Sequence, residues 1–115
     1  MRLYLYEKCD TCRKALQWLK ARGIAYTAIP IREQPPTLAE LQTMLRHVGD
    51  LKRLFNTSGG DYKTMNMKDR LPTLPEPEVL ALLAAHGNLV KRPFALSKTT
   101  GTTGFDAAKW QQLFP

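Results

Sequence analysis

The two cysteines of the chain, Cys9 and Cys12, lie three positions apart near its start. The run Leu-Tyr-Leu-Tyr at 3–6 before them consists of residues that favour a β-strand. Cys12 and the apolar residues after it recur at the spacing of one helix face, which predicts a helix over residues 11–22 that Gly23 ends. Cys9 is therefore expected where a strand ends and a helix begins.

The start of a helix favours the thiolate form of a cysteine. The first backbone N–H groups have no partner within the helix, and the helix dipole is positive there. Both effects stabilise a negative sulfur at Cys9; the cations Lys8 and Arg13 act in the same direction, whereas Asp10 opposes them. Cys12 lies one turn along the same face, within reach of a disulfide. We therefore expect a redox pair in which Cys9 attacks and Cys12 resolves.

Two other interpretations of this cysteine pair stay open. A zinc site needs two further ligands at a compatible spacing, and the two histidines, His47 and His86, stand far apart, so we expect no metal. A purely structural pair is the second alternative, because free cysteine is among the most buried residue types. The strand–Cys-x-x-Cys–helix arrangement favours redox chemistry over both.

The composition of the chain limits the classes to which it can belong. Its 115 residues, 43% of them hydrophobic, suffice for one domain with its own core. No segment approaches the ~20 apolar residues of a membrane span, and no signal peptide is visible, so we expect a cytoplasmic protein without membrane contact. The net charge of +7 is typical of a solvated basic surface or of a face toward an anionic partner.

The remaining elements alternate between strands and helices. Residues 24–29 are predicted as a second strand, which gives a right-handed βαβ unit with parallel strands. Thr37 and Glu40 form a capping box for a helix that Gly49 ends. Further along we expect a helical turn at 51–55, a loop at 56–60, helical pieces in 62–70, a helix over 76–86 ended by Gly87, a strand at 94–96, a hairpin at 98–104 into a last strand, and a helix over 107–113 capped by Asp106. This order predicts an α/β fold, a thioredoxin-like three-layer α/β/α arrangement with a small mixed four-stranded sheet.

Four motifs give the chain a resemblance to a known family. They are the Cys9–Arg13 loop after the first strand, Pro35-Pro36-Thr37 before the second helix, Lys91-Arg92-Pro93 before the third strand, and Gly104-Phe105 before the last helix. With them the chain resembles the arsenate reductase (ArsC)/Spx family over nearly its whole length. The resemblance implies a single domain, 1–115, with a thioredoxin-like core of about 1–34 and 90–115 and a helical insertion of about 35–90.

The resemblance also assigns roles to residues. In the arsenate reductases of this family one cysteine attacks the oxyanion and three arginines hold its charge. Cys9 falls on the nucleophile and Arg92 on one of the arginines, but the other two positions fall near the uncharged Asn56 and Phe105. Arsenate is therefore expected to bind weakly, because bidentate charged donors are missing.

Substrate binding is expected to involve several polar residues. Arg92, Arg13, Lys8 and Asn56 are the candidates for binding the substrate or its anionic groups. The resemblance makes Pro93 a candidate cis-proline, as in thioredoxin-like folds generally.

Two functions follow from the resemblance. The first is a thiol–disulfide oxidoreductase similar to the YffB-like relatives, which look like glutathione-dependent thiol reductases. It would act on glutathione or a small thiol substrate, use glutathione, a glutaredoxin or a thioredoxin as electron donor, and hold no tightly bound cofactor. The alternative is an Spx-type redox-sensing regulator that binds the α subunit of RNA polymerase. Gly49 falls near the glycine with which these regulators contact the polymerase, but their contacting arginine falls near Ser58 in this chain. We expect a monomer without direct nucleic-acid contact.

Overall fold

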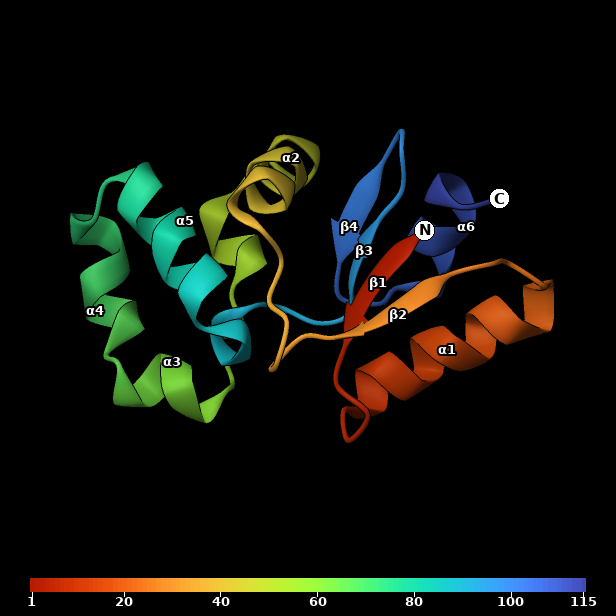
Figure 1. Cartoon of the computed structure of the whole chain (residues 1–115), viewed down its shortest axis with the longest axis horizontal. Helices are drawn as coiled ribbons and strands as arrows, with labels where there is room; N and C mark the ends of the chain where they lie inside the picture. Colours follow the sequence, from red (N-terminus) through yellow and green to blue (C-terminus); the bar gives the residue numbers. More distant parts are fainter.

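A four-stranded sheet with the order β2-β1-β3-β4 organises the fold (Figure 1). The computed structural model describes all 115 residues. The strands are β1 (Arg2–Leu5), β2 (Thr27–Pro30), β3 (Phe94–Leu96) and β4 (Gly101–Thr103). β1 and β2 are parallel and are joined by helix α1 (Asp10–Arg22), whereas β3 pairs antiparallel with both β1 and β4. The mixed four-stranded sheet predicted from the order of the elements is confirmed.

Helices cover both faces of the sheet. Successive side chains of a strand point to opposite faces, so Leu3 and Tyr4 enter different cores. The core on the side of Leu3 is completed by α1 and α6 (Ala107–Leu113). The core on the side of Tyr4 is completed by α2 (Leu38–Val48) and by the helices beyond it. The predicted three-layer α/β/α arrangement is therefore confirmed.

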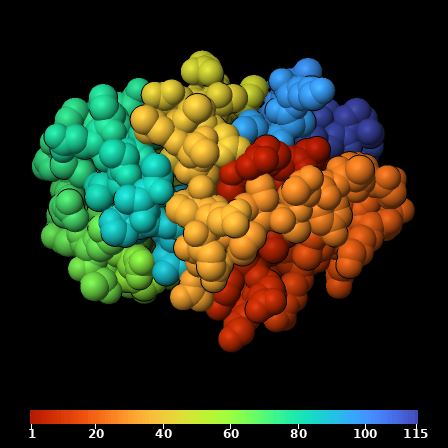
Figure 2. All heavy atoms as spheres, viewed as in Figure 1, coloured from red at the N-terminus to blue at the C-terminus, as the bar shows by residue number.

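The helices that follow α2 extend away from the sheet and form a second lobe (Figures 1 and 2). After η1 (Leu51–Leu54), which is joined to β4 by the hydrogen bond from Thr103 Oγ1 to the Arg53 carbonyl, the lobe consists of α3 (Gly60–Thr64), α4 (Met67–Arg70), η2 (Leu71–Thr73), α5 (Glu76–Ala85) and η3 (Gly87–Leu89). The chain leaves and re-enters this lobe side by side, because Phe55 and Val90 form an antiparallel bridge. None of the helices has both the length and the apolar character needed to cross a bilayer.

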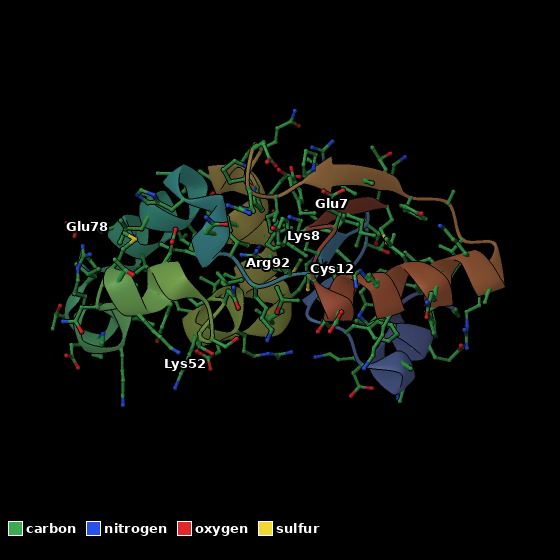
Figure 3. All side chains as sticks on the ribbon, turned by 90° about the horizontal axis from the view of Figure 1, so that it is seen from below. Glu7, Lys8, Cys12, Lys52, Glu78 and Arg92 are labelled. Carbon is green, nitrogen blue, oxygen red and sulfur yellow. The ribbon has the colours of Figure 1, made fainter.

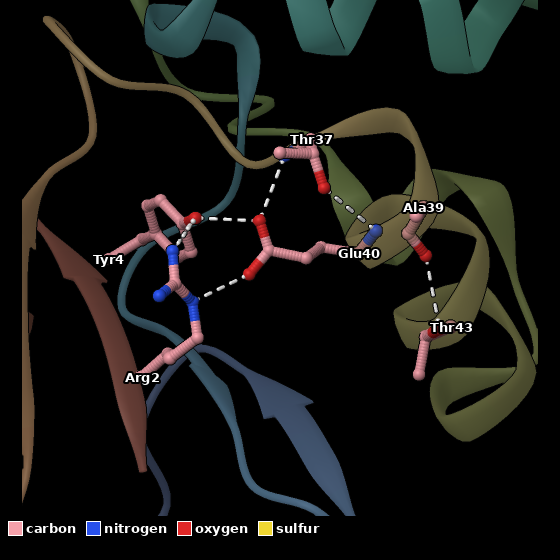
Figure 4. Close-up of polar contacts among 6 residues, drawn as sticks. All are labelled: Arg2, Tyr4, Thr37, Ala39, Glu40 and Thr43. Carbon is pink, nitrogen blue, oxygen red and sulfur yellow. Dashed lines mark hydrogen bonds and ion pairs between the residues drawn. The ribbon is translucent and has the colours of Figure 1, made fainter.

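A polar network joins α2 to the start of β1 (Figure 4). Tyr4 Oη donates to Glu40 Oε1 at 2.6 Å, and Arg2 Nε donates to Glu40 Oε2 at 2.9 Å. The predicted capping box is present too, since the Thr37 N–H donates to Glu40 and Thr37 Oγ1 accepts the Glu40 N–H. Burial raises the pKa of the Glu40 carboxyl, but the hydrogen bonds from Thr37, Tyr4 and Arg2 outweigh it and leave the pKa below its ordinary value.

The start of the second strand differs from the prediction. The second strand begins at Thr27 rather than at residue 24, because Gly23 adopts a left-handed φ of 64° and the Ile24 N–H still donates to Leu19 of α1. The last strand, Gly101–Thr103, lies in the hairpin segment 98–104 and before Phe105, where the sequence predicts it.

Gly87 does not end the helix before it, as the sequence suggested. α5 ends at Ala85, and His86 occupies the C-cap position with a φ of −132°. Gly87 instead begins η3, where its Cα packs directly on another part of the backbone. A Cβ at this position would clash with the carbonyl oxygen of Ile31 and would lie 3.1 Å from the Cα of Arg32. A glycine is therefore required at this position because the backbone of Ile31 and Arg32 lies too close for a Cβ, and not because a helix ends here.

Candidate functional site

The segments that carry the predicted chemistry meet at one edge of the sheet. β1 and β2 are parallel and β3 is antiparallel to β1, so the ends of the first two strands and the start of the third lie together. Figure 3 shows Glu7, Lys8, Cys12 and Arg92 close to one another in the middle of the molecule. Arg32 follows β2 at the same edge.

Cys9 occupies the N-cap of α1, the position expected from the sequence. Its sulfur accepts a hydrogen bond from the Cys12 N–H at 3.4 Å, and the side chain is half-buried. The backbone is held on both sides, because the Cys9 N–H donates to Tyr6 and the Cys9 carbonyl accepts from Arg13. A sulfur held in this way faces the free amides at the positive end of the helix dipole and is open to an incoming group.

Cys12 lies beneath Cys9 and is 1% exposed. Both thiols are free. Burial, together with the neighbouring Cys9, raises the pKa of the Cys12 thiol to about 12, although the backbone of Tyr6 and the charge of Arg92 act in the opposite direction. Cys12 is therefore a protonated thiol at neutral pH, whereas Cys9 is the sulfur that solvent can reach.

Arg92 is half-buried beside the two cysteines. Its Nε donates to the carbonyl of Val90 at 3.3 Å, and its Nη2 donates to those of Asn88 at 2.8 Å and Gly87 at 3.5 Å. Burial lowers the pKa of Arg92, while the nearby sulfur atoms act in the opposite direction. Main-chain carbonyls thus fix the guanidinium group, and its Nη1 has no hydrogen-bond partner in the chain.

Tyr6 and Arg32 belong to this site but were not among the residues selected from the sequence. The ring centroid of Tyr6 lies 4.9 Å from Cζ of Arg32 and 5.9 Å from Cζ of Arg92, so two guanidinium groups share one aromatic ring. Arg32 is exposed and forms no ion pair within the chain. One available signal could have identified it, because residues that follow parallel neighbouring strands meet at the carboxyl edge of the sheet.

The other three candidate anion-binding residues differ in whether their side chains already have partners in the chain. Lys8 is exposed and unpaired. Arg13 donates to the Glu7 carbonyl at 3.1 Å and pairs with Asp10 at 3.3 Å, so a carboxylate already neutralises part of its charge. Asn56 N–H donates to Leu89, and its side-chain oxygen accepts from Ser58; neither bond joins it to the cysteines.

The last two motifs of the sequence flank the site. The Arg92–Pro93 peptide bond is cis, and the Pro93 carbonyl accepts the Gly104 N–H at 2.8 Å. The ring of Phe105 packs against Trp18 and Trp110, with centroid distances of 6.4 and 5.1 Å. Phe105 thus contributes to the core on the α1 side. The structure contains no group of three or more His, Cys, Asp or Glu side chains arranged to hold a metal ion.

Comparisons with known proteins identify the family and related folds. The chain matches the family model described as the ArsC family over residues 4–113. It is 43% identical over 110 residues to the uncharacterized protein YusI of Bacillus subtilis (strain 168), covering 95% of this chain and 93% of that protein. It is 33% identical over 108 residues to the global transcriptional regulator Spx 2 of Oceanobacillus iheyensis, covering 93% of this chain and 78% of that protein. A solved structure described as an ArsC family related protein from Bacteroides fragilis has a TM-score of 0.92 and 39% identity, covering 97% of this chain and 95% of that one.

Proposed function

The chain belongs to the ArsC family, and from this membership and the geometry of its cysteines we propose that it is a thiol–disulfide oxidoreductase. One observation carries the proposal. The half-buried sulfur of Cys9 lies at the start of α1, accepts the Cys12 amide, and covers a second free thiol one turn further along. An accessible nucleophile with a resolving thiol beneath it is the arrangement that disulfide exchange requires.

The proposed reaction has two exchange steps. The Cys9 thiolate attacks one sulfur of a substrate disulfide, a Cys9–substrate disulfide forms, and the other substrate half leaves as a thiolate that takes a proton from solvent. The Cys12 thiol then loses its proton and attacks the Cys9 sulfur, so that the Cys9–Cys12 disulfide forms and the second half leaves. Two electrons have passed to the substrate, and glutathione, a glutaredoxin or a thioredoxin returns the enzyme to its dithiol form.

Cations around Cys9 would hold an anionic substrate. Arg92 is fixed by carbonyls and offers its free Nη1 to a carboxylate. Lys8 adds positive charge from solvent, whereas Arg13 contributes less because Asp10 pairs with it. Asn56 stays a candidate neutral donor at the edge of the second lobe.

Turnover of a mixed disulfide tests the proposal. The substrate is the disulfide of glutathione and 2-mercaptoethanol, with added glutathione as reductant. The glutathione disulfide that forms is followed through NADPH consumption by glutathione reductase. Wild-type protein should accelerate the reaction and Cys9→Ser should return it to the background rate. With the substrate alone and no added glutathione, Cys12→Ser should complete the first step only and accumulate a Cys9 mixed disulfide visible by mass spectrometry. A wild-type rate equal to that of Cys9→Ser would refute the proposal.

A second function has an observation of its own in its favour. Several relatives are named global transcriptional regulator Spx, and their similarity covers almost the whole chain. Under this alternative the Cys9–Cys12 disulfide would act as a switch that controls binding to the α subunit of RNA polymerase. Binding to the C-terminal domain of that subunit by the oxidised form alone, without any disulfide turnover, would favour the regulator. Equal or absent binding by both redox forms would exclude it.

A further inference from the structure

We infer that Tyr6, Arg32 and Glu33 form a subsite beside Cys9 for the γ-glutamyl end of a glutathione-containing substrate, which carries one carboxylate and one ammonium group. The inference rests on the proposed disulfide exchange for its choice of substrate. It assigns a binding role to residues that the chemistry of the two cysteines does not use.

The first argument is an excess of positive charge at Tyr6. Arg32 and Arg92 both lie against its ring, at 4.9 and 5.9 Å from the centroid. The ion pairs of the chain are Arg2–Glu40 and Arg13–Asp10, so no carboxylate neutralises either guanidinium group at this ring. Arg32 contributes, after burial, to the lowered pKa of Arg92. An anion bound between the two arginines would relieve this repulsion.

The second argument is that the backbone of Arg32 is held in place. The Ile31 N–H donates to Leu5 of β1 at 3.0 Å, and the Gln34 N–H donates to Pro30 of β2 at 2.8 Å. Gly87 packs directly on the backbone of Ile31 and Arg32 from the other side. The guanidinium group therefore projects to solvent from a turn that is fixed on two sides, which lowers the entropy that binding must offset.

The third argument is a cavity next to the same ring. It has a volume of about 340 Å³ and is lined by apolar residues of β1 and β2 together with Tyr6, Glu7 and Glu33. The segments that form it, coloured red and orange, meet on the face shown in Figure 2. Neither glutamate pairs with a cation of the chain. Carboxylates at the cavity and guanidinium groups beside it match the two charges of an α-amino acid group.

The ring of Tyr6 connects the subsite to the loop that carries the nucleophile. The carbonyl of Tyr6 accepts the Cys9 N–H at 3.1 Å, so the ring and the nucleophile belong to one tight loop. The γ-glutamyl carboxylate and ammonium lie several bonds from the sulfur of glutathione. A subsite for them must therefore lie away from the Cys9 sulfur, and Arg32 and Glu33 belong to a different segment, the turn after β2 at the same edge of the sheet.

Binding of S-methylglutathione, which cannot exchange disulfides, tests the subsite. Its dissociation constant is measured by calorimetry on the reduced full-length chain. Arg32→Gln and Glu33→Gln should each weaken binding about tenfold, because each removes one charge-assisted contact. Arg46→Gln and Glu78→Gln remove the same charges in α2 and α5 and should change binding by less than about twofold. Figure 3 shows Glu78 at the far end of the molecule from Cys12.

The ammonium group has a probe of its own. N-acetyl-S-methylglutathione should bind wild-type protein about tenfold more weakly than S-methylglutathione and should show no further loss in Glu33→Gln. Absence of saturable S-methylglutathione binding, or equal losses in Arg32→Gln and Arg46→Gln, would overturn the subsite. Turnover of bis(2-hydroxyethyl) disulfide, which is uncharged, would then still support the proposed function. Conversely, binding that depends on Arg32 without any turnover would refute the oxidoreductase and leave the subsite standing.

Discussion

The charged groups at the two ends of β1 differ in whether they are paired with an opposite charge. At the start of the strand, Arg2 and Tyr4 both bond to Glu40, so the charge of the carboxylate is matched and its oxygens are satisfied. At the end of the strand, Tyr6 lies against two guanidinium groups that no carboxylate neutralises, next to two free thiols.

This difference separates stabilising residues from functional ones within a single strand. Hydrogen bonds to charged groups contribute about 1.5–3 kcal/mol when both partners are present, so the start of β1 stabilises the packing of α2 on the sheet. At the end of β1, Arg32 and Arg92 have no carboxylate partner, so their free N–H groups are available to a ligand. We expect substitutions at the start of β1 to change stability and those at its end to change chemistry and binding.

The largest expected effect concerns the Cys12 thiol, near the end of β1 where the charges are unpaired. Because burial raises the pKa of the Cys12 thiol well above that of an ordinary thiol, resolution of the Cys9 mixed disulfide should accelerate about tenfold per pH unit from pH 7 to 10, without levelling off near pH 9. Quenched-flow mass spectrometry of the glutathionylated protein measures this step. In Cys12→Ser the mixed disulfide should persist at each pH, and a flat wild-type profile would contradict a buried, protonated Cys12.

The next effect concerns the close packing of Gly87 on the turn at Ile31. Gly87→Ala should lower the free energy of unfolding by about 2–3 kcal/mol, since the new Cβ meets the backbone of Ile31, which cannot move as a side chain would. Gly60→Ala in α3 is the matched control: it enters open space and should stabilise the chain by up to about 1 kcal/mol. Urea unfolding followed by circular dichroism measures both variants. Equal unfolding free energies would show that the turn at Ile31 adapts freely.

The smallest effect belongs to the paired end of β1. Glu40→Gln should cost about 1–2 kcal/mol at pH 7 and leave disulfide turnover unchanged. The folded-state pKa of Glu40 is below the ordinary 4.5, so its contribution is complete above pH 4.5 and is lost as the pH falls through the folded-state pKa. The stability difference between wild type and variant should therefore shrink in acid. A Glu78→Gln control should stay within about 0.5 kcal/mol of wild type, and loss of turnover in Glu40→Gln would remove the distinction between the two ends.

Local signals explain what the sequence could predict of the fold. The strand before Cys9 and the helix after it each have a periodicity of their own, which is why the placement of the two cysteines agrees with the structure. The capping box of Thr37 and Glu40 is equally local. The second role of Glu40, as acceptor for Tyr4 and Arg2, depends on α2 folding onto β1 and has no signature within its own segment.

The contacts of the site, like the second role of Glu40, join distant segments and have no local sequence signature. The sequence marks Arg32 only as a residue of a proline-bounded loop, and its neighbours Tyr6 and Arg92 lie 26 and 60 positions away. Their meeting follows from parallel pairing of β1 with β2 and from the close approach of Gly87, both of which are long-range. The prediction that Gly87 ends a helix was wrong. A glycine after an apolar helical stretch usually ends a helix, and the contact with Ile31 that requires this glycine is not visible in the sequence around it.

The bridge between Phe55 and Val90 has a consequence for how this fold can vary. Backbone bonds from Lys91 to Leu54 and from Asn56 to Leu89 close the neck of the outer lobe immediately before Arg92. These bonds at the neck set where the chain returns to the edge of the sheet that carries Cys9 and Arg92. The helices α3, α4 and α5 beyond this closure can therefore vary in length and in surface residues without moving the cysteines. The segment η3 cannot vary in this way, because the carbonyls of Gly87 and Asn88 accept hydrogen bonds from Arg92 and Gly87 packs on the turn at Ile31.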